Sequence, residues 1–439
     1  MKKTARTVGG IAICASISMV LSGCGGPSAG GAPTALTSIP DTDPTATIQV
    51  VSHMTLDNDG MQKVIDAFEK EHPTIKVEWK AVPFKDMNSL IDSRISQKSG
   101  AMDVYYVDQP RLAALVSRGY LEELTAAFSD QTSEWDKSAT EANTYDGKLW
   151  AVPLATSTQL LYYNKDILDK AGLMAPSADP DKRISWEALK SEAAKAQSNG
   201  GAKYGFMFGQ MDRYYQLEPL FVEAGGGTGI SGDDGLTPDF ESNGWTKALE
   251  YYKSLFADGV SPRGQEEMQD EFYAGNVAFM QDGTWAIDKA SKTDFNWGVA
   301  ASPTFEGTDA KTPTGSWSLG MNPYSDSKEA AAIFMNWMAC QDGGQISVYQ
   351  PAPDLPASKK ARERYFTRDV FQTDAGKNAV NLINYELENT AVIRPQTIGY
   401  VEFEEVLNRA FADVRNGADP TTSLKNATTQ LNTAWAAYK

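Results

Sequence analysis

The chain has 439 residues, with 57 acidic and 40 basic side chains and a formal net charge of −17. Such a surface repels phosphate backbones, and no local basic patch is visible, so no nucleic acid partner is expected and anionic lipid headgroups are disfavoured. The two histidines and three cysteines do not have the spacing of a zinc site, and they leave little material for histidine-based catalysis. We expect no metal and no cofactor.

The first 24 residues have the pattern of an export signal. Lys2, Lys3 and Arg6 precede the apolar run 8–21, which is too short to stay in a bilayer as a spanning helix. Residues 21–24 (LSGC) then resemble a bacterial lipobox, in which the cysteine thiol accepts a diacylglyceryl group before cleavage. We therefore expect a lipoprotein signal peptide over 1–23 and lipidation of Cys24. An ordinary secretory signal with an incidental cysteine is the alternative.

Residues 24–47 are almost all Gly, Ala, Ser, Thr, Pro and Asp, which predicts a flexible tether. No later stretch is long and apolar enough to span a membrane, so we expect a soluble body outside the cytoplasm. The lipid anchor would hold it on the cell membrane of a bacterium of Gram-positive type. Loss of residues 1–23 would take the net charge to about −20. Cys340 ends an apolar run typical of a buried helix, where a thiol is a small hydrophobic side chain.

About 390 residues follow the tether, more than one hydrophobic core usually supports, so two lobes are expected. Short β-like runs alternate with amphipathic helical patterns, which predicts an α/β fold with a largely parallel sheet. Strands are expected at 48–51, 75–79, 103–108, 160–163, 204–208, 277–280, 297–300 and 318–321. Helices are expected at 61–72, 87–97, after Ser185, 215–224, 327–340 and from 399 onward. Ligands bind beyond strand ends in such sheets, so loops 53–58 and 108–111 are candidate binding loops.

Two short matches to enzyme motifs fail on context. Residues 26–30 (GPSAG) fit a nucleophile elbow but lie in the predicted tether. Residues 227–232 (GTGISG) fit a dinucleotide fingerprint but follow a helical run and precede a turn, in the wrong order for a phosphate site. A carboxylate-pair glycoside hydrolase stays open as an alternative, because 57 acids are available and none is marked as a pair. We expect no enzyme.

Ten tryptophans and eighteen tyrosines give the body a large aromatic content. Sugar rings pack their C–H faces on aromatic rings, and their hydroxyl groups need Asp, Asn, Gln or Arg partners. Trp285 follows a strand in an Asp282-Gly283 turn, and Trp317 follows Gly315 and Ser316 before another strand, so both are candidate stacking residues. A packing role at a lobe edge is the alternative for each. The tryptophans that fall on strand or helix patterns are expected in the core or on helix faces: Trp79, Trp186, Trp245, Trp297 and Trp337.

The body resembles a known family along its whole length. Residues 147–153 (GKLWAVP) followed by 161–166 (LYYNKD) are the most characteristic segment. Further matches follow in the expected order at 103–108, 119–124, 275–285, 298–307 and 327–331. On these residues the chain is similar to the extracellular solute-binding proteins of ABC importers, family 1, the sugar-binding, maltose-binding-protein-like group.

The resemblance implies a two-lobed periplasmic-binding-protein-like fold with a hinge and an interlobe ligand cleft. Lobe 1 would comprise 48–155 and 316–378, and lobe 2 would comprise 156–315 and 379–439. The chain would cross near Ala155 to Gln159, near Thr312 to Ser316 and near 375–380. Closure on an oligosaccharide would then be recognised by the permease subunits of the importer. We expect a monomer that contacts the membrane only through its lipid. The alternative within the family is a non-sugar solute such as a peptide.

The resemblance also implies site residues. Trp285 matches the stacking tryptophan of the second lobe, and Asp108 and Gln109 match a loop that contacts sugar hydroxyls. The segment Thr156 to Thr158 matches the hinge strand beside the cleft, and Arg394 to Phe403 matches a C-terminal segment near the ligand. The chain departs from the pattern where it has Val107 and Phe403 in place of tryptophan, and there Trp317 would offer a different stacking surface. The full predicted binding set is His53, Asp57, Asn58, Asp108, Gln109, Thr156, Ser157, Asp212, Tyr214, Tyr215, Asp282, Trp285, Ser316, Trp317 and Arg394.

Overall fold

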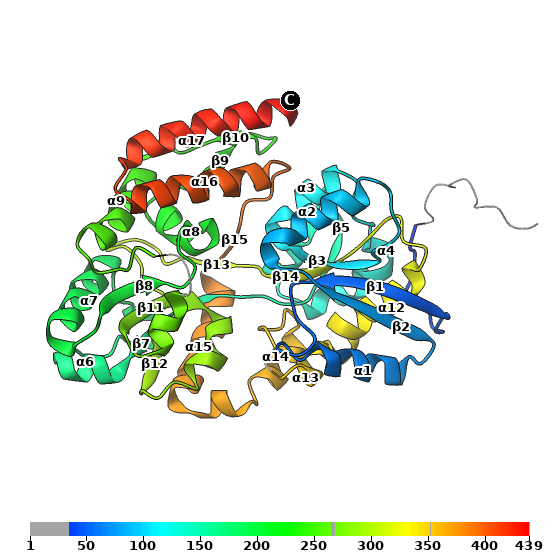
Figure 1. The fold of residues 1–439 in the computed structure, drawn as a ribbon, viewed down its shortest axis with the longest axis horizontal. Coiled ribbons are helices and arrows are strands. Elements are labelled where there is room, and N and C mark those ends of the chain that lie inside the picture. The colour runs from blue at the N-terminus through cyan, green and yellow to red at the C-terminus, as the bar shows by residue number, and fades with distance from the viewer. Residues whose placement is uncertain (1–34, 265–267, 352, 439) are drawn as a thin grey trace, which may run out of the picture. The chain divides into compact units, whose positions relative to one another are not determined.

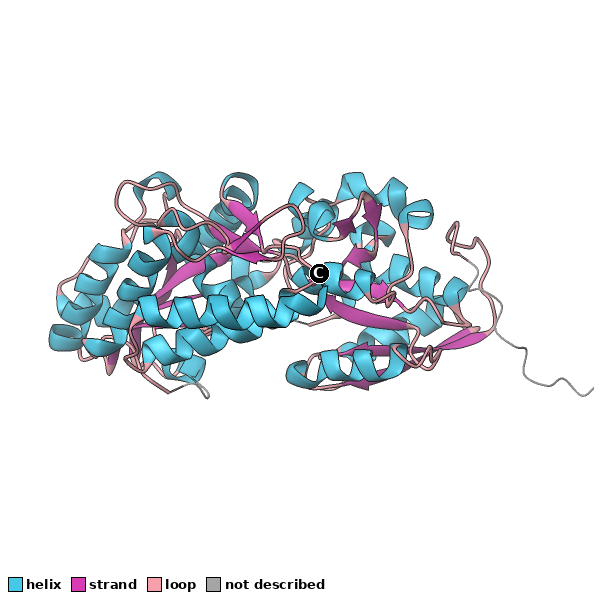
Figure 2. Cartoon of the chain, turned by 90° about the horizontal axis from the view of Figure 1, so that it is seen from above, coloured by secondary structure: helices cyan, strands magenta, loops and turns pink. Residues whose placement is uncertain are grey.

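The computed structural model of the protein describes residues 35–264, 268–351 and 353–438. Cys24 and the predicted signal peptide lie outside these residues. Two main sheets, each flanked by helices, build two lobes (Figures 1 and 2). In the described ranges no helix is both long and apolar enough to cross a membrane. The predicted α/β, two-lobed class is confirmed.

The first sheet has the strand order β2-β1-β3-β14-β6. Its strands are β1 (Ala46–Ser52), β2 (Ile75–Ala81), β3 (Val104–Asp108), β6 (Ala151–Pro153) and β14 (Trp317–Met321). β1 runs parallel to β2 and to β3, as the β-α-β-α-β pattern predicts. β14 runs antiparallel to β3 and β6, and its register places Trp317 opposite Asp108. A strand from late in the chain therefore completes the sheet begun at the N-terminus.

The second sheet has the order β12-β7-β11-β8. Its strands are β7 (Gln159–Asn164), β8 (Tyr204–Phe208), β11 (Val277–Gly283) and β12 (Trp297–Ala300). β7 is antiparallel to both β11 and β12, and only β11 and β8 pair in parallel, so the expectation of a largely parallel sheet is wrong here. Alternate residues of β7 enter different cores: Leu161 and Tyr163 join one cluster, Leu160 and Tyr162 the other. Both faces of this sheet are thus buried.

Helices cover each sheet. The helices with side chains in the first core are α1 (Met61–Glu71), α2 (Phe84–Ile95), α3 (Leu112–Ser117), α4 (Thr125–Phe128), α5 (Lys137–Ala142), α12 (Lys328–Ala339) and α13 (Ile346–Tyr349). On one face of the second sheet lie α6 (Lys165–Ala171), α7 (Trp186–Gly200), α8 (Tyr214–Glu223), α9 (Asn243–Ala257), α16 (Tyr400–Arg415) and α17 (Pro420–Trp435). On the other lie α10 (Met268–Tyr273), α11 (Ile287–Ala290), α15 (Asp374–Asn389) and the end of α14 (Lys359–Tyr365).

Local sequence explains several of these boundaries. In α1 the buried residues Met61, Val64, Ile65 and Phe68 have the spacing of one helix face. α7 begins where Ser185 accepts a hydrogen bond from the Ala188 backbone N–H, as its N-cap position predicts. The helix predicted from 399 onward is interrupted at Gly417, and its two parts are α16 and α17.

Three short strand pairs complete the fold. β4 (Thr144–Tyr145) and β5 (Lys148–Leu149) form a hairpin, β9 (Ile230–Ser231) pairs with β10 (Thr237–Pro238), and β13 (Thr312–Thr314) pairs with β15 (Ala391–Ile393). Asp146 and Gly147 both have positive φ, 50° and 71°, the conformation that a two-residue hairpin turn requires. The glycine at the start of the characteristic 147–153 segment therefore has a backbone role.

Two predicted boundaries need correction. Leu36 is buried in the first core and its N–H bonds Glu122 Oε1 at 3.0 Å, so the described end of the expected tether packs on the body. The expected crossing at 375–380 lies inside α15, which packs on the second sheet together with Tyr365 and Phe371. The third crossing segment instead contains Leu355 and Pro356, which lie beside the first crossing segment. There the Leu355 carbonyl accepts the Thr156 N–H at 2.8 Å, and Pro356 pairs with Ala155. The exact lobe limits stay a prediction.

Candidate functional site

The first sheet brings an aromatic group together at one edge. His53 follows β1, Asp108 ends β3 and Trp317 begins β14, and β3 lies between the other two strands. The His53 ring centroid is 4.1 Å from that of Trp317, with the ring planes 30° apart. Tyr106 approaches His53 edge-on at 5.8 Å. Trp317 is half-buried, so this edge presents a layered aromatic surface.

Gln109 fixes the turn that precedes Trp317. Its Oε1 accepts the Ser316 N–H at 2.8 Å and its Nε2 donates to Ser318 Oγ at 3.1 Å. Gly315 has φ +94°, and a Cβ there would lie 2.6 Å from Gln109 Oε1, so only glycine fits. The Gln109 amide therefore positions the turn, and its predicted contact with a ligand stays a prediction.

Trp285 lies beyond β11 in the 3₁₀ turn Thr284–Ala286. A Cβ on Gly283 would lie 2.1 Å from the Trp285 ring, so glycine allows the indole to lie back against the backbone. The indole is half-buried and stands 5.9 Å from the Tyr215 ring. Asp282 is fully buried, and this burial raises its pKa to about 7 against the opposing effects of the Gly283 N–H and Trp285. Gln269 Nε2 donates to its Oδ2 at 3.0 Å.

A continuous set of polar contacts runs between these two tryptophans. Ser157 Oγ donates to the Gly315 carbonyl at 2.6 Å and shares a 2.8 Å hydrogen bond with the Tyr215 hydroxyl. The Arg394 guanidinium lies 4.9 Å from the centroid of the Tyr215 ring, and its Nη2 lies 3.0 Å from Asp108 Oδ1. Residues from β3, α8 and the segments that pass between the sheets are thus joined in one group.

The ion pair in this group is buried and electrostatically matched. Burial alone would raise the pKa of Asp108, but Arg394, Arg111 and Arg213 together outweigh it and hold the pKa below its usual value. Burial would lower the pKa of Arg394, yet Asp108 and the other negative groups keep it above its usual value. Both side chains therefore stay charged and bind each other. The two charges are thus paired with each other, and the role of Asp108 and Arg394 as ligand contacts stays a prediction.

The remaining predicted residues divide into three kinds. Thr156 Oγ1 pairs with Thr314 Oγ1 at 3.2 Å between two crossing segments. Asp57 and Asn58 are exposed in the loop after His53, and Ser316 is half-buried. Asp212 and Tyr214 have structural roles: Asp212 pairs with Arg415 and Tyr252, and the buried Tyr214 hydroxyl donates to the Thr228 carbonyl at 2.8 Å. Both side chains are held within the second lobe, and their predicted part in ligand binding stays a prediction.

Several polar and aromatic neighbours of this group are not in the predicted binding set. Arg111 pairs with Glu404 of α16 at 2.5 Å, and Glu404 is also 3.5 Å from Arg213. Tyr106 carries a signal that could have been used, because it lies two residues before Asp108 and shares its side of β3. Arg111 lies three residues after Asp108, but nothing in the local pattern points to a partner 293 positions away.

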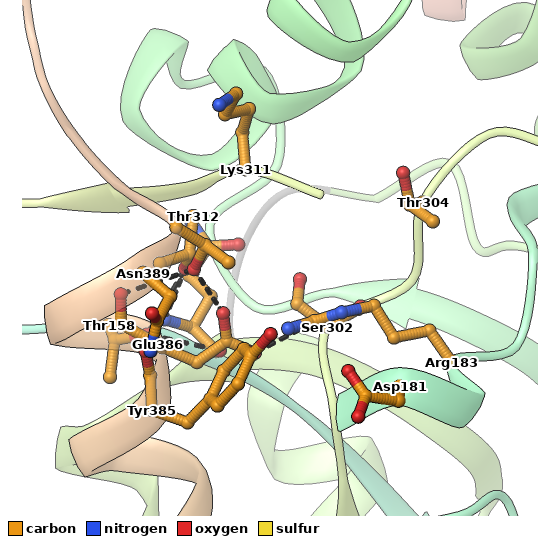
Figure 3. Close-up of polar contacts among 12 residues, drawn as sticks. Thr158, Asp181, Arg183, Ser302, Thr304, Lys311, Thr312, Tyr385, Glu386 and Asn389 are labelled. Carbon is orange, nitrogen blue, oxygen red and sulfur yellow. Dashed lines mark hydrogen bonds and ion pairs between the residues drawn. The ribbon is translucent and has the colours of Figure 1, made fainter. Parts of the chain in front are cut away.

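A second polar cluster lies beside β13 and α15 (Figure 3). Arg183 Nη1 lies 2.7 Å from Glu386 Oε1 and 2.9 Å from the Ser302 carbonyl oxygen, and Thr390 also bonds Glu386. Thr158 and Thr312 share a 3.1 Å hydroxyl contact next to it. These contacts hold the crossing segments that contain Thr158 and Thr312 against the second sheet. Within the described part of the chain, no group of three His, Cys, Asp or Glu is arranged to hold a metal ion.

Comparison with known proteins decides the family. The family described as bacterial extracellular solute-binding protein matches residues 55–344. The chain belongs to this family. Among related solute-binding proteins, the galactooligosaccharide-binding protein of Bacillus subtilis is 24% identical over 359 residues, which are 79% of each chain. The mannitol-binding protein of Pseudomonas aeruginosa is 25% identical over 297 residues, 65% of this chain and 67% of the relative.

A solved structure supports the same fold for this solute-binding protein. An ABC substrate-binding protein of Listeria monocytogenes in complex with cycloalternan superposes with a TM-score of 0.77 at 22% identity. The match covers 90% of this chain and 100% of the Listeria chain. The resemblance found along the sequence, in segments from 103–108 to 327–331, is therefore confirmed as membership of the solute-binding family.

Proposed function

We propose that this solute-binding protein captures an oligosaccharide between its lobes and delivers it to the permease subunits of an ABC importer. The observation that carries the proposal is the pair of half-buried tryptophans, Trp285 on the second sheet and Trp317 on the first, joined by one polar group. Indole faces suit sugar rings, and the polar groups between them suit sugar hydroxyls. The galactooligosaccharide-binding relative and the cycloalternan complex support the same class of ligand.

In this proposal binding is coupled to closure of the lobes. Asp108 and Arg394 neutralise each other in the free protein, so a neutral sugar can approach without a charge penalty and exchange hydrogen bonds with this pair. Stacking on Trp285 is available from the second lobe, while Trp317 contributes from the first. A ligand that touches both lobes favours the closed state by its differential affinity for that state. Delivery to the permease would follow from recognition of the closed form.

The test is the Trp285→Ala variant. We expect its affinity for the oligosaccharide found in a thermal-shift screen to fall by at least about tenfold, because the largest stacking face of the second lobe is lost. Isothermal titration calorimetry of wild type and variant measures the change.

Trp297→Phe is the matched control. Trp297 lies on the same sheet opposite Asn164, at the far end of β7 from Trp285. The Trp297→Phe substitution should therefore leave affinity unchanged. Equal affinities of Trp285→Ala and wild type would contradict the stacking role. Absence of any oligosaccharide binding by wild type would contradict the function itself.

A polyol is the second candidate ligand, because the mannitol-binding protein of Pseudomonas aeruginosa is a relative at similar identity. An open-chain polyol offers hydroxyls but no ring face. If mannitol binds and Trp285→Ala does not weaken it, the polyol assignment is favoured over the oligosaccharide.

We propose further that Cys24 carries the lipid that anchors the protein on the outer face of the cell membrane. Residues 1–24 support this through their basic start, short apolar run and LSGC sequence. Expression of the Cys24→Ser variant in a Gram-positive host should move the protein from the membrane fraction to the medium. Retention of the variant in the membrane fraction would overturn the lipid anchor.

A further inference from the structure

The strongest unused feature of the site is the contact between His53 and Trp317. The imidazole lies over the indole, with ring centroids 4.1 Å apart and the ring planes 30° apart, so it occupies one face of the indole. Resting on the proposed function, we propose that His53 is a displaceable cover of the Trp317 stacking face. Its imidazole occupies, in the free protein, the place that a sugar ring takes on binding.

The first argument is that little holds the imidazole in place. Its Nδ1 is buried and has no hydrogen-bond partner among the described residues, so covering the indole leaves a polar nitrogen unsatisfied. The ring contacts with Trp317 and Tyr106 are what favour the covered position. A sugar ring that replaces the imidazole restores the stacking on Trp317 and lets the imidazole reach water. The exchange therefore conserves the contact and removes the penalty.

The second argument comes from the groups that face His53. They are Asp59 from its own loop, Asp108 from β3, the Tyr106 ring and the Trp317 indole; Asp354 lies near Asp59. Asp59 is engaged by Thr55, whose N–H and Oγ1 donate to it at 2.6 and 2.9 Å. Asp108 is engaged by Arg394. Within the described ranges no carboxylate bonds the imidazole, so the covered form gains no salt bridge that a ligand would have to break.

The electrostatics then predict proton uptake. Burial lowers the pKa of His53 to about 4, only partly offset by Asp59 and Asp108. A displaced, solvated imidazole has a pKa near 6.5. Displacement is therefore favoured as pH falls from 6.5 towards 4, and ligand binding takes up a proton in that range. Affinity should rise with falling pH, by up to about 30-fold between pH 7.5 and pH 5.

The cover also affects selectivity. A ring-shaped ligand replaces the stacking contact that His53 gives up, whereas an open-chain polyol leaves the indole face uncovered. The His53 cover would thus disfavour small acyclic solutes in a site whose hydroxyl partners alone would accept them.

The experiment compares wild type with His53→Ala and His53→Phe, using the oligosaccharide identified by the thermal-shift screen. His53→Ala removes the cover, so its affinity at pH 7.5 should be about two- to tenfold higher than wild type. His53→Phe keeps an aromatic cover that cannot titrate, so its affinity should not exceed that of wild type. It also reports on the site if the alanine variant fails to fold. Both variants should lose the rise of affinity with falling pH that depends on His53.

Calorimetric titrations at pH 5, 6 and 7.5, each in two buffers of different ionisation enthalpy, give the affinity and the proton uptake together. Wild-type uptake near pH 5.5 that is absent in both variants supports the cover. If wild type binds the sugar but His53→Ala binds it no more tightly, or keeps the wild-type proton uptake, the cover is wrong and the capture function stands. If wild type binds no oligosaccharide, the proposed function fails and the cover with it.

Discussion

Glu218 shows at the residue scale how burial without a full set of partners controls a charge. It is fully buried in α8; its Oε1 lies 3.3 Å from the Tyr214 hydroxyl oxygen, whose proton is donated to the Thr228 carbonyl, and Oε2 has no hydrogen-bond partner among the described residues. Burial raises its pKa to about 8, against the opposing influence of Arg394 and Tyr214. Since its ordinary value is 4.5, the folded protein holds this proton more tightly than the unfolded chain. Glu218 therefore lowers stability as pH rises from 4.5 to 8.

Glu218→Gln should remove this pH dependence, because the glutamine amide can donate to the Tyr214 oxygen and cannot ionise. We expect the variant to match wild type near pH 5 and to be more stable at pH 8.5. The difference should grow by up to about 1.4 kcal/mol per pH unit between these values. Urea unfolding at pH 5, 7 and 8.5 measures it. Parallel stability curves for the two proteins would show that Glu218 is already ionised in the native state.

At the element scale, a buried ion pair joins parts of the chain that belong to different cores. Arg111 lies in the 3₁₀ turn Gln109–Arg111 at the edge of the first sheet, and Glu404 lies in α16, whose buried residues belong to the core of the second. Their side chains are 11% and 5% exposed. Desolvation offsets much of the attraction in such a pair, so its presence adds little stability, while loss of one partner strands a charge.

Glu404→Gln should therefore cost about 3 kcal/mol or more in unfolding free energy. The double variant Arg111→Met, Glu404→Leu should recover most of that loss, because Asp108 keeps its ion pair with Arg394 and the Arg213 side chain is 28% exposed. Urea unfolding of the wild type, Arg111→Met, Glu404→Leu and the double variant gives the coupling energy. The exposed pair Lys203–Glu271 is the control, and Glu271→Gln should change stability by less than about 1 kcal/mol. Independent, additive effects of the two buried substitutions would rule out the coupling.

For the whole molecule, local sequence patterns predicted the elements well and their long-range pairing poorly. The apolar spacing of α1 and the Ser185 cap of α7 are local signals, and both describe the structure correctly. The antiparallel placement of β14 beside β3 depends on contacts more than 200 positions apart, which no local period encodes. The same limit applies to the site. The glycine turns before Trp285 and Trp317 are visible in the sequence, whereas the buried partners of Asp212, Asp108 and Arg111 are not.

The late position of β14 in the chain affects the order in which the two sheets can form during synthesis. β3 lacks its neighbour β14 until the ribosome has made residue 321, whereas all four strands of the second sheet are present by residue 300. The inserted sheet can thus associate before the sheet that encloses it in sequence, and the N-terminal strands must wait for a late partner. Such delayed, non-local pairing slows folding. The first three strands of the chain therefore stay without the antiparallel partner of β3 until about three quarters of the protein has been synthesised.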